Sequence, residues 1–164
     1  MNKEPLRFKN GKFKIMLIGD LHESYDMYSD NAANKADDMN ALLTKAVEEL
    51  NPDLVVYLGD NAGADNEMQM RSVISRILYP VSLRDIPFAV VFGNHDREHP
   101  VDLRTQMRLY NEHDCCYMYN ADDSITGYGN YNLLVKGSKS DKDILNLWFM
   151  DSNNLADNQD LSYY

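Results

Sequence analysis

Three short apolar runs recur along the first part of the chain, and each ends in glycine followed by aspartate or asparagine. The runs are continuous rather than alternating, a pattern typical of strands that are buried on both faces, as in a parallel sheet. We therefore predict three parallel, adjacent strands near residues 14–19, 53–59 and 87–93.

Between these runs, apolar residues follow the three- and four-residue spacing of amphipathic helices, each with one stripe that packs on the sheet. The second of these two helices is expected to end or kink at Pro80, because proline interrupts the helical hydrogen bonds. The two stripes are Met39, Leu42, Leu43, Ala46, Val47 and Leu50, and then Met70, Val73, Ile74, Ile77, Leu78 and Val81.

A third helix is predicted to begin at Pro100, since proline suits the first helical turn. Its apolar positions, which we expect to be buried, are Leu103, Met107 and Tyr110. The element order is then β-α-β-α-β-α, which requires a parallel sheet with right-handed crossovers. This order predicts the α/β fold class.

The pattern changes in the C-terminal part of the chain. Residues 114–127 predict a loop, and two apolar runs at 131–136 and 144–150, joined by a polar link, predict a β-hairpin. The remaining residues are polar and show no period. We expect a single layered domain over residues 1–164.

Composition excludes several classes of protein. Apolar residues make up 44% of the 164 residues and charged residues 26%, ordinary values for a soluble globular protein. The 16 basic and 26 acidic residues give a net charge of −10, which argues against nucleic-acid and membrane partners because phosphate affinity comes mainly from Lys and Arg.

No apolar run reaches the roughly 18 residues of a membrane span, and no signal-peptide pattern opens the sequence. The adjacent Cys115 and Cys116 are expected to be free thiols. We therefore expect a cytoplasmic protein.

Potential metal ligands follow each predicted strand. Asp20, Asp60 and Asn94 stand at the strand ends, and His22 and His95 come shortly after. Parallel strands place their carboxyl ends along one edge of the sheet, where ligands bind. Oxygen ligands combined with imidazole suit divalent Mn, Fe or Zn. Each dipeptide alone is common by chance, but three of them at separate strand ends predict a metal site.

The motifs themselves resemble a known family. Residues 13–153 are similar to the calcineurin-like metallophosphoesterase superfamily, and the segment at 148–152 is most similar to its branch related to purple acid phosphatases. The resemblance implies a layered metallophosphoesterase-like sandwich. The segments that carry it are Asp20-Leu21-His22, Gly59-Asp60-Asn61 and Gly93-Asn94-His95-Asp96.

The resemblance also implies a role for each residue. Asp20 and His22 would bind one divalent ion, Asp60 would bridge it to a second, and Asn94 would bind the second. A hydroxide activated by two metals would then hydrolyse a phosphate ester. His95 would contact the phosphate or protonate the leaving oxygen, since its pKa lies near neutral pH.

Two departures from the family pattern lie close to these motifs. Gly63 stands where purple acid phosphatases carry tyrosine, and His22 has no counterpart in them, so no purple tyrosinate–iron chromophore is expected. Protein phosphatases carry an aspartate at the position of Gly63, which orients the catalytic histidine. Asp96, assigned with His95 to the catalytic pair, or Asp65 is the candidate substitute.

The family's C-terminal histidine motifs are absent from this sequence, whose only other histidines are His99 and His113. His99 is able to reach a substrate phosphate, but a solvated loop position is the favoured interpretation. His113 is expected to end the third helix, where a cation suits the helix dipole. The sequence thus resembles a truncated sandwich, in which one apolar sheet face lacks its cover and favours self-association.

Two functions from different classes remain open. The first is a metal-dependent phosphoesterase that acts on a monoester, a diester or a nucleotide. The second is a truncated, non-catalytic relative that binds metal weakly or pairs with a partner. An all-helical phosphohydrolase built on the dipeptide His95-Asp96 is disfavoured, because the dipeptide follows a predicted strand.

Overall fold

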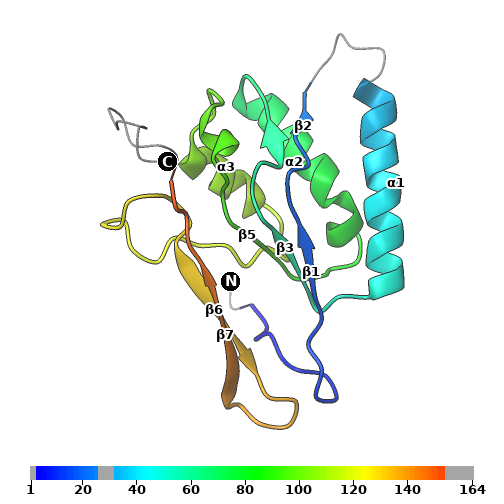
Figure 1. Cartoon of the computed structure of the whole chain (residues 1–164), viewed down its shortest axis with the longest axis vertical. Helices are drawn as coiled ribbons and strands as arrows, with labels where there is room; N and C mark the ends of the chain where they lie inside the picture. Colours follow the sequence, from blue (N-terminus) through cyan, green and yellow to red (C-terminus); the bar gives the residue numbers. More distant parts are fainter. Residues whose placement is uncertain (1–2, 26–31, 154–164) are drawn as a thin grey trace, which may run out of the picture.

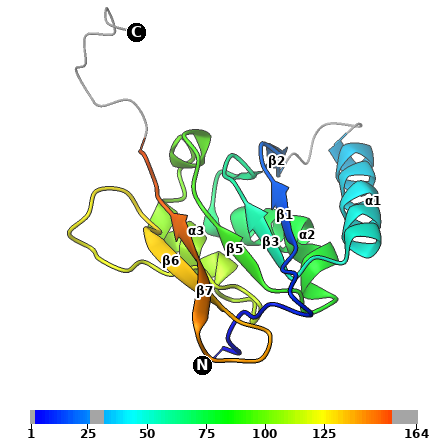
Figure 2. The same cartoon turned by 60° about the horizontal axis from the view of Figure 1, so that its bottom comes forward.

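The structure is a computed structural model that describes residues 3–25 and 32–153. A parallel sheet lies at its centre, helices α1, α2 and α3 stand together on one side, and a β-hairpin lies beside the sheet (Figures 1 and 2). This arrangement confirms the α/β class and the predicted order of elements. No helix in the described part of the chain is both long and apolar enough to span a bilayer.

The central sheet contains β1 (Ile15–Ile18), β3 (Leu54–Tyr57) and β5 (Phe88–Val90), in the order β1-β3-β5. Both pairs are parallel, with Ile15 beside Leu54 and Val56 beside Ala89. The three predicted strands are therefore adjacent and parallel, as expected. Their carboxyl ends lie at one edge of the sheet.

Burial differs between the strands. Every residue of β3 and β5 is buried, in agreement with the continuous apolar runs. In β1, however, Leu17 is 62% exposed, so the expectation of burial on both faces is wrong for this strand. The reason is its position: β1 pairs only with β3 among the described strands, and its outward face has no helix against it.

Helix α1 (Ala32–Leu50) begins well before the predicted stripe. Leu43 and Val47 are buried, whereas Leu42 and Leu50 are exposed. The buried stripe is thus narrower than the sequence pattern indicated. A helix that packs at the side of a small sheet, mainly against α2, needs only a narrow apolar face.

Helix α2 (Glu67–Ser82) matches its prediction closely, since all six residues of its apolar stripe are buried. Asn66 caps it by accepting a hydrogen bond from the Gln69 N–H. The helix continues two residues beyond Pro80, so the proline does not end it at once. Pro80 itself is buried. The Tyr57 hydroxyl donates to the carbonyl of Ile77 and joins the helix to β3.

Helix α3 (Leu103–Tyr110) begins three residues after the predicted start at Pro100. Asp102 forms the N-cap and accepts a hydrogen bond from the Thr105 N–H at 2.8 Å. The side-chain cap therefore decides the start of the helix, not the proline. Leu103 and Tyr110 are buried as expected, whereas Met107 is only partly buried.

A second small sheet, which the sequence pattern does not predict, pairs β2 (Glu23–Ser24) in parallel with β4 (Ala62–Gly63). These strands extend the chain beyond β1 and β3, past the predicted metal ligands. Two-residue strands are too short for any periodicity to reveal. Glu23 is buried and forms an ion pair with Arg76 of α2, which anchors this sheet to the helix layer.

The predicted hairpin is present as β6 (Tyr131–Lys136) and β7 (Asp143–Phe149). Tyr131 joins it to the main sheet, because its hydroxyl accepts from the N–H of Val90 and donates to the carbonyl of the same residue. Between β7 and the outer face of the sheet lies an apolar groove of about 350 Å³. The residues of this apolar groove are Ile15, Leu17, Val56, Leu58, Val91, Leu147, Trp148, Phe149 and Met150.

Candidate metal centre

The residues that follow β1 and β3 adopt an unusual backbone conformation. Asp20, His22 and Asp60 have φ values of 55°, 46° and 53°. The left-handed region is uncommon for residues other than glycine. Such strain persists only where surrounding contacts enforce it, and it concentrates at functional sites. Here it turns three potential ligands away from the strand direction.

Hydrogen bonds between the two loops enforce this conformation. The Asp20 N–H donates to the Gly59 carbonyl at 3.1 Å, and the His22 N–H donates to the Asp60 carbonyl at 2.9 Å. The pairing then continues into β2 and β4. The backbones of these three residues are therefore held relative to one another by hydrogen bonds within the loops and by the strand pairing that follows.

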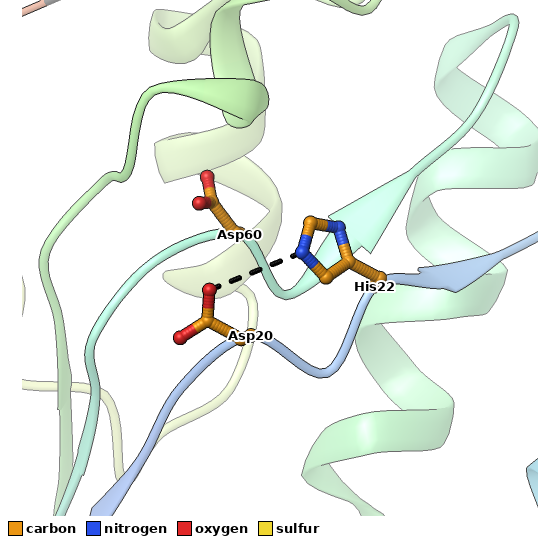
Figure 3. Close-up of side chains that lie close together, drawn as sticks. All are labelled: Asp20, His22 and Asp60. Atoms are coloured by element: carbon orange, nitrogen blue, oxygen red, sulfur yellow. Dashed lines mark ion pairs between the residues drawn. The ribbon is translucent and has the colours of Figure 1, made fainter.

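Their side chains form a compact group of possible metal ligands. One oxygen of Asp20, one oxygen of Asp60 and one nitrogen of His22 lie within 4.8 Å of one another. Figure 3 shows the Asp20 carboxylate directed towards the His22 ring, with a separation of 3.9 Å between Oδ1 and Nε2. Two ligands of one Zn-like ion lie at most about 4.4 Å apart. Asp20 and His22 are exposed, so small rotations bring the group into that range.

The third loop, after β5, closes on the Asp60 carboxylate. Its Oδ1 accepts a hydrogen bond from the His95 N–H at 2.8 Å. A Cβ on Gly93 would lie 2.4 Å from the same oxygen, so only glycine permits this approach. Asn94 stands between these two contacts and is exposed. The structure thus brings the Asn94 segment to the group, and its role as a ligand stays a prediction.

His95 lies beside the group and is held by a carboxylate that the sequence analysis did not identify. Its Nδ1 is 2.7 Å from Oε2 of Glu98, and its ring centroid is 5.5 Å from that of His22. The hydrogen bond and the charge of Glu98 raise the pKa of His95 above its usual value. With Nδ1 occupied, Nε2 is the ring nitrogen left for a ligand. The i, i+3 spacing of the two residues was the only available signal in the sequence.

Asp96 occupies a different place from the one its catalytic assignment suggests. It is buried, and its Oδ2 accepts hydrogen bonds from the N–H groups of Gly93 at 2.7 Å and Asp60 at 2.9 Å. Burial raises the pKa of this carboxyl group. Its carboxylate therefore holds two loops together, and the contact expected of it or of Asp65 with the His95 ring is made by Glu98 instead. A catalytic role for Asp96 stays a prediction.

The group opens into a small pocket of about 80 Å³. His99 lies in a loop, as expected, but it is half-buried in the wall of the pocket rather than fully solvated. His113 lies elsewhere, with its Nδ1 3.1 Å from the Ser82 hydroxyl, and burial lowers its pKa. The pocket is lined by His22, Glu23, Ser24, Asp60, Ala62, Gly63, His95, Asp96 and His99.

Comparison with known proteins agrees with this geometry. The sequence model of a family described as calcineurin-like phosphoesterase matches residues 13–162. The chain belongs to the calcineurin-like phosphoesterase family. The match includes the hairpin and all three loops that carry the predicted ligands.

Curated relatives extend the comparison. The chain is 29% identical to "Probable inactive purple acid phosphatase 29" of Arabidopsis thaliana, over 92% of this chain and 43% of that protein. It is 30% identical to "Phosphatase DCR2" of Saccharomyces cerevisiae, over 87% of this chain and 27% of that protein. The chain therefore spans less than half the length of these relatives. Family members normally use divalent metals, and the Asp20–His22–Asp60 group is the candidate site for one here.

Proposed function

We propose that this chain binds a divalent ion at Asp20, His22 and Asp60 and takes part in the hydrolysis of phosphate esters. The observation that carries the proposal is the convergence of these three side chains at strand ends, directly beside His95. The donor set of two carboxylates and one imidazole fits Mn, Fe or Zn. Asn94 is the further ligand that we propose, and Asp60 is the residue through which a second ion would be shared.

A divalent ion at this site supplies Lewis-acid stabilisation of phosphate charge and activates water. The residues of the chain provide the rest. Asp60 is held through its backbone by Asp96 and through its side chain by the His95 N–H, so its position is set before any ligand binds. His95 carries a proton at Nε2 that it donates to the leaving oxygen, while Glu98 fixes the ring through Nδ1.

A second candidate, a metal-binding relative without catalytic activity, is favoured by two observations. Three of the curated relatives carry the words "probable inactive" in their names. In the described residues, the group of close ligand atoms has only three members. On this interpretation the site binds an ion weakly and turns over no ester.

Metal binding and turnover separate the two candidates. We would measure Mn²⁺ affinity by the loss of the free-ion electron paramagnetic resonance signal, and hydrolysis with p-nitrophenyl phosphate and its bis-ester. The proposal expects Mn²⁺ to bind, and hydrolysis to be slow, to require added metal and to vanish in His95→Ala. Metal binding without hydrolysis of either ester supports the second candidate, and absence of metal binding contradicts both.

Substitutions then test the assignment of ligands. Asp60→Asn is expected to weaken Mn²⁺ binding most, because this carboxylate lies between the loops of β3 and β5. Asp143→Asn is the matched control: it removes an exposed carboxylate of the hairpin that does not line the pocket. Equal Mn²⁺ affinity in the two variants would contradict the proposed role of Asp60.

A further inference from the structure

His99 is a half-buried histidine whose ring has no hydrogen-bond or ion-pair partner among the described residues. The other three histidines each lie against a carboxylate or a hydroxyl group. An imidazole always has at least one N–H group to donate. The ring of His99 therefore has an N–H group that no other described residue uses.

The backbone of β4 makes room for this ring at Gly63. A Cβ at that position would lie 2.6 Å from Cε1 and 2.7 Å from Nε2 of His99. Gly63 does not adopt a left-handed backbone conformation, so its lack of a side chain matters only for the space above it. A histidine in open solvent would need no such space. The ring of His99 therefore lies directly against the strand at Gly63.

The ring of His99 also lies at the pocket beside the candidate metal group. His99 lines the same pocket as His22, Asp60 and His95. The pocket volume of about 80 Å³ is several times the roughly 10–15 Å³ that one water molecule needs. A group of the size of a tetrahedral anion, bound at Asp60, would therefore lie near the His99 ring. His99 is not a member of the compact ligand group, so it is a candidate for contact with substrate rather than with metal.

We propose that His99 is a substrate-binding residue, whose imidazole N–H donates a hydrogen bond to a phosphate oxygen of the ester. This inference rests on the proposed function of the Asp20–His22–Asp60 group. It gives the pocket two imidazole donors with different tasks. His95, fixed by Glu98, serves the leaving oxygen, and His99, which lies against Gly63, holds an oxygen that stays on phosphorus.

The first experiment measures binding of inorganic phosphate to the Mn²⁺-loaded chain by calorimetry, beside the affinity for Mn²⁺ alone. His99→Ala is expected to weaken phosphate binding roughly tenfold, as for one hydrogen bond to a charged group, and to leave Mn²⁺ affinity unchanged. His99→Asn keeps an N–H donor and is expected to recover part of the affinity. His113→Asn removes an imidazole outside the pocket and serves as the control.

The second experiment moves the ring without removing it. Gly63→Ala places a methyl group where the His99 ring lies, so it is expected to weaken phosphate binding in the otherwise unchanged chain. In the His99→Ala background the same methyl group meets no ring and is expected to have no further effect. Comparing Gly63→Ala in the two backgrounds is a double-mutant cycle, which separates displacement of His99 from general damage to β4.

The outcomes distinguish this inference from the proposed function. If the unchanged chain binds no Mn²⁺, the proposed function is wrong and the role of His99 is wrong with it. If the chain binds both ions and His99→Ala binds phosphate equally well, only the role of His99 is wrong. A loss of Mn²⁺ affinity in His99→Ala would make His99 a metal ligand and would also overturn the inference. Tenfold weaker phosphate binding with unchanged Mn²⁺ affinity supports it.

Discussion

Oδ2 of Asp96 lies 2.9 Å from the backbone N of Asp60, so a buried carboxylate fixes the residue proposed to bridge two ions. The same oxygen accepts from the N–H of Gly93 at 2.7 Å. One side chain therefore joins the loop after β3 to the loop after β5. The candidate metal centre depends on this connection, because ligands from separate strands must meet at one point.

Asp96→Ala tests the connection. The substitution leaves two N–H groups without their acceptor, and we expect the free energy of unfolding to fall by about 3 kcal/mol. Loss of a residue that supports a ligand typically weakens metal binding about 10- to 100-fold, and we expect Mn²⁺ affinity to fall in that range. Chemical denaturation and Mn²⁺ titration provide the two measurements.

Asp102→Ala is the matched control, because it removes another aspartate that accepts a backbone N–H, at the start of α3. It is expected to cost about 1 kcal/mol and to leave Mn²⁺ affinity unchanged. If Asp96→Ala behaves in the same way, Asp96 is an ordinary structural residue and does not position Asp60.

The pair of His95 and Glu98 leads to a prediction about pH. Because the Glu98 carboxylate raises the pKa of His95, the imidazole of the metal-free chain should titrate above the usual value in NMR spectra. Glu98→Gln removes the charge and is expected to lower that pKa. Glu67→Gln, an exposed carboxylate of α2 paired with Arg71 and Arg108, is the control and should leave the pKa of His95 unchanged.

The sign of the effect on stability follows from the direction of this shift. The folded chain binds the His95 proton more tightly than the unfolded chain does. The pairing with Glu98 therefore stabilises the fold below the unfolded pKa of about 6.5. This contribution is lost as the pH rises through the raised folded value. A titration of His95 at or below its usual pKa would contradict the contact.

The sequence predicted the frame of this site better than its details. Buried runs and helical spacing were enough to place β1, β3 and β5 side by side, because hydrophobic burial determines those elements. The partners of Asp96 and of the His95 ring depend instead on side-chain directions in three loops, two of which contain left-handed residues. No local spacing specifies those directions. The exposure of Leu17 likewise depends on which strand lies at the edge, a property of the whole sheet.

Asp151 connects the hairpin to the loop that follows β5 through an ion pair with Arg97. The carboxylate is buried, and it also accepts a hydrogen bond from the Tyr128 N–H at 2.7 Å. Loss of Arg97 leaves the buried carboxylate of Asp151 without its opposite charge. We therefore expect Arg97→Met to lower the free energy of unfolding by about 3–5 kcal/mol.

Denaturant unfolding of Arg97→Met measures this loss, with Lys45→Ala as control. Lys45 forms an ion pair with Glu49 on the exposed surface of α1, and such pairs contribute only about 0–1 kcal/mol. Similar small losses in the two variants would show that the link between hairpin and loop contributes little. A large loss for Arg97→Met alone would confirm that the hairpin stabilises the loop that carries His95.

The apolar groove leads to the prediction of self-association. Leu17, Trp148 and Met150 are 62%, 67% and 70% exposed along it. In the described part of the chain, β1 pairs only with β3 and β7 pairs only with β6, so two strand edges next to the groove also have free backbone groups. A second copy of the chain is able to satisfy both features, since it presents the same apolar residues and the same free edges.

Light scattering across a range of concentrations measures this association, and we expect dimers or larger species that become monomers in Trp148→Lys. Tyr79→Lys is the control, because Tyr79 is an exposed aromatic residue on α2, outside the groove. Trp148 is the sole tryptophan of the chain, so its fluorescence should shift to shorter wavelength as the groove is covered. A chain that stays monomeric at all concentrations, with an unshifted tryptophan spectrum, would contradict the prediction. The exposed groove would then be a stable surface of the isolated chain rather than an interface between copies.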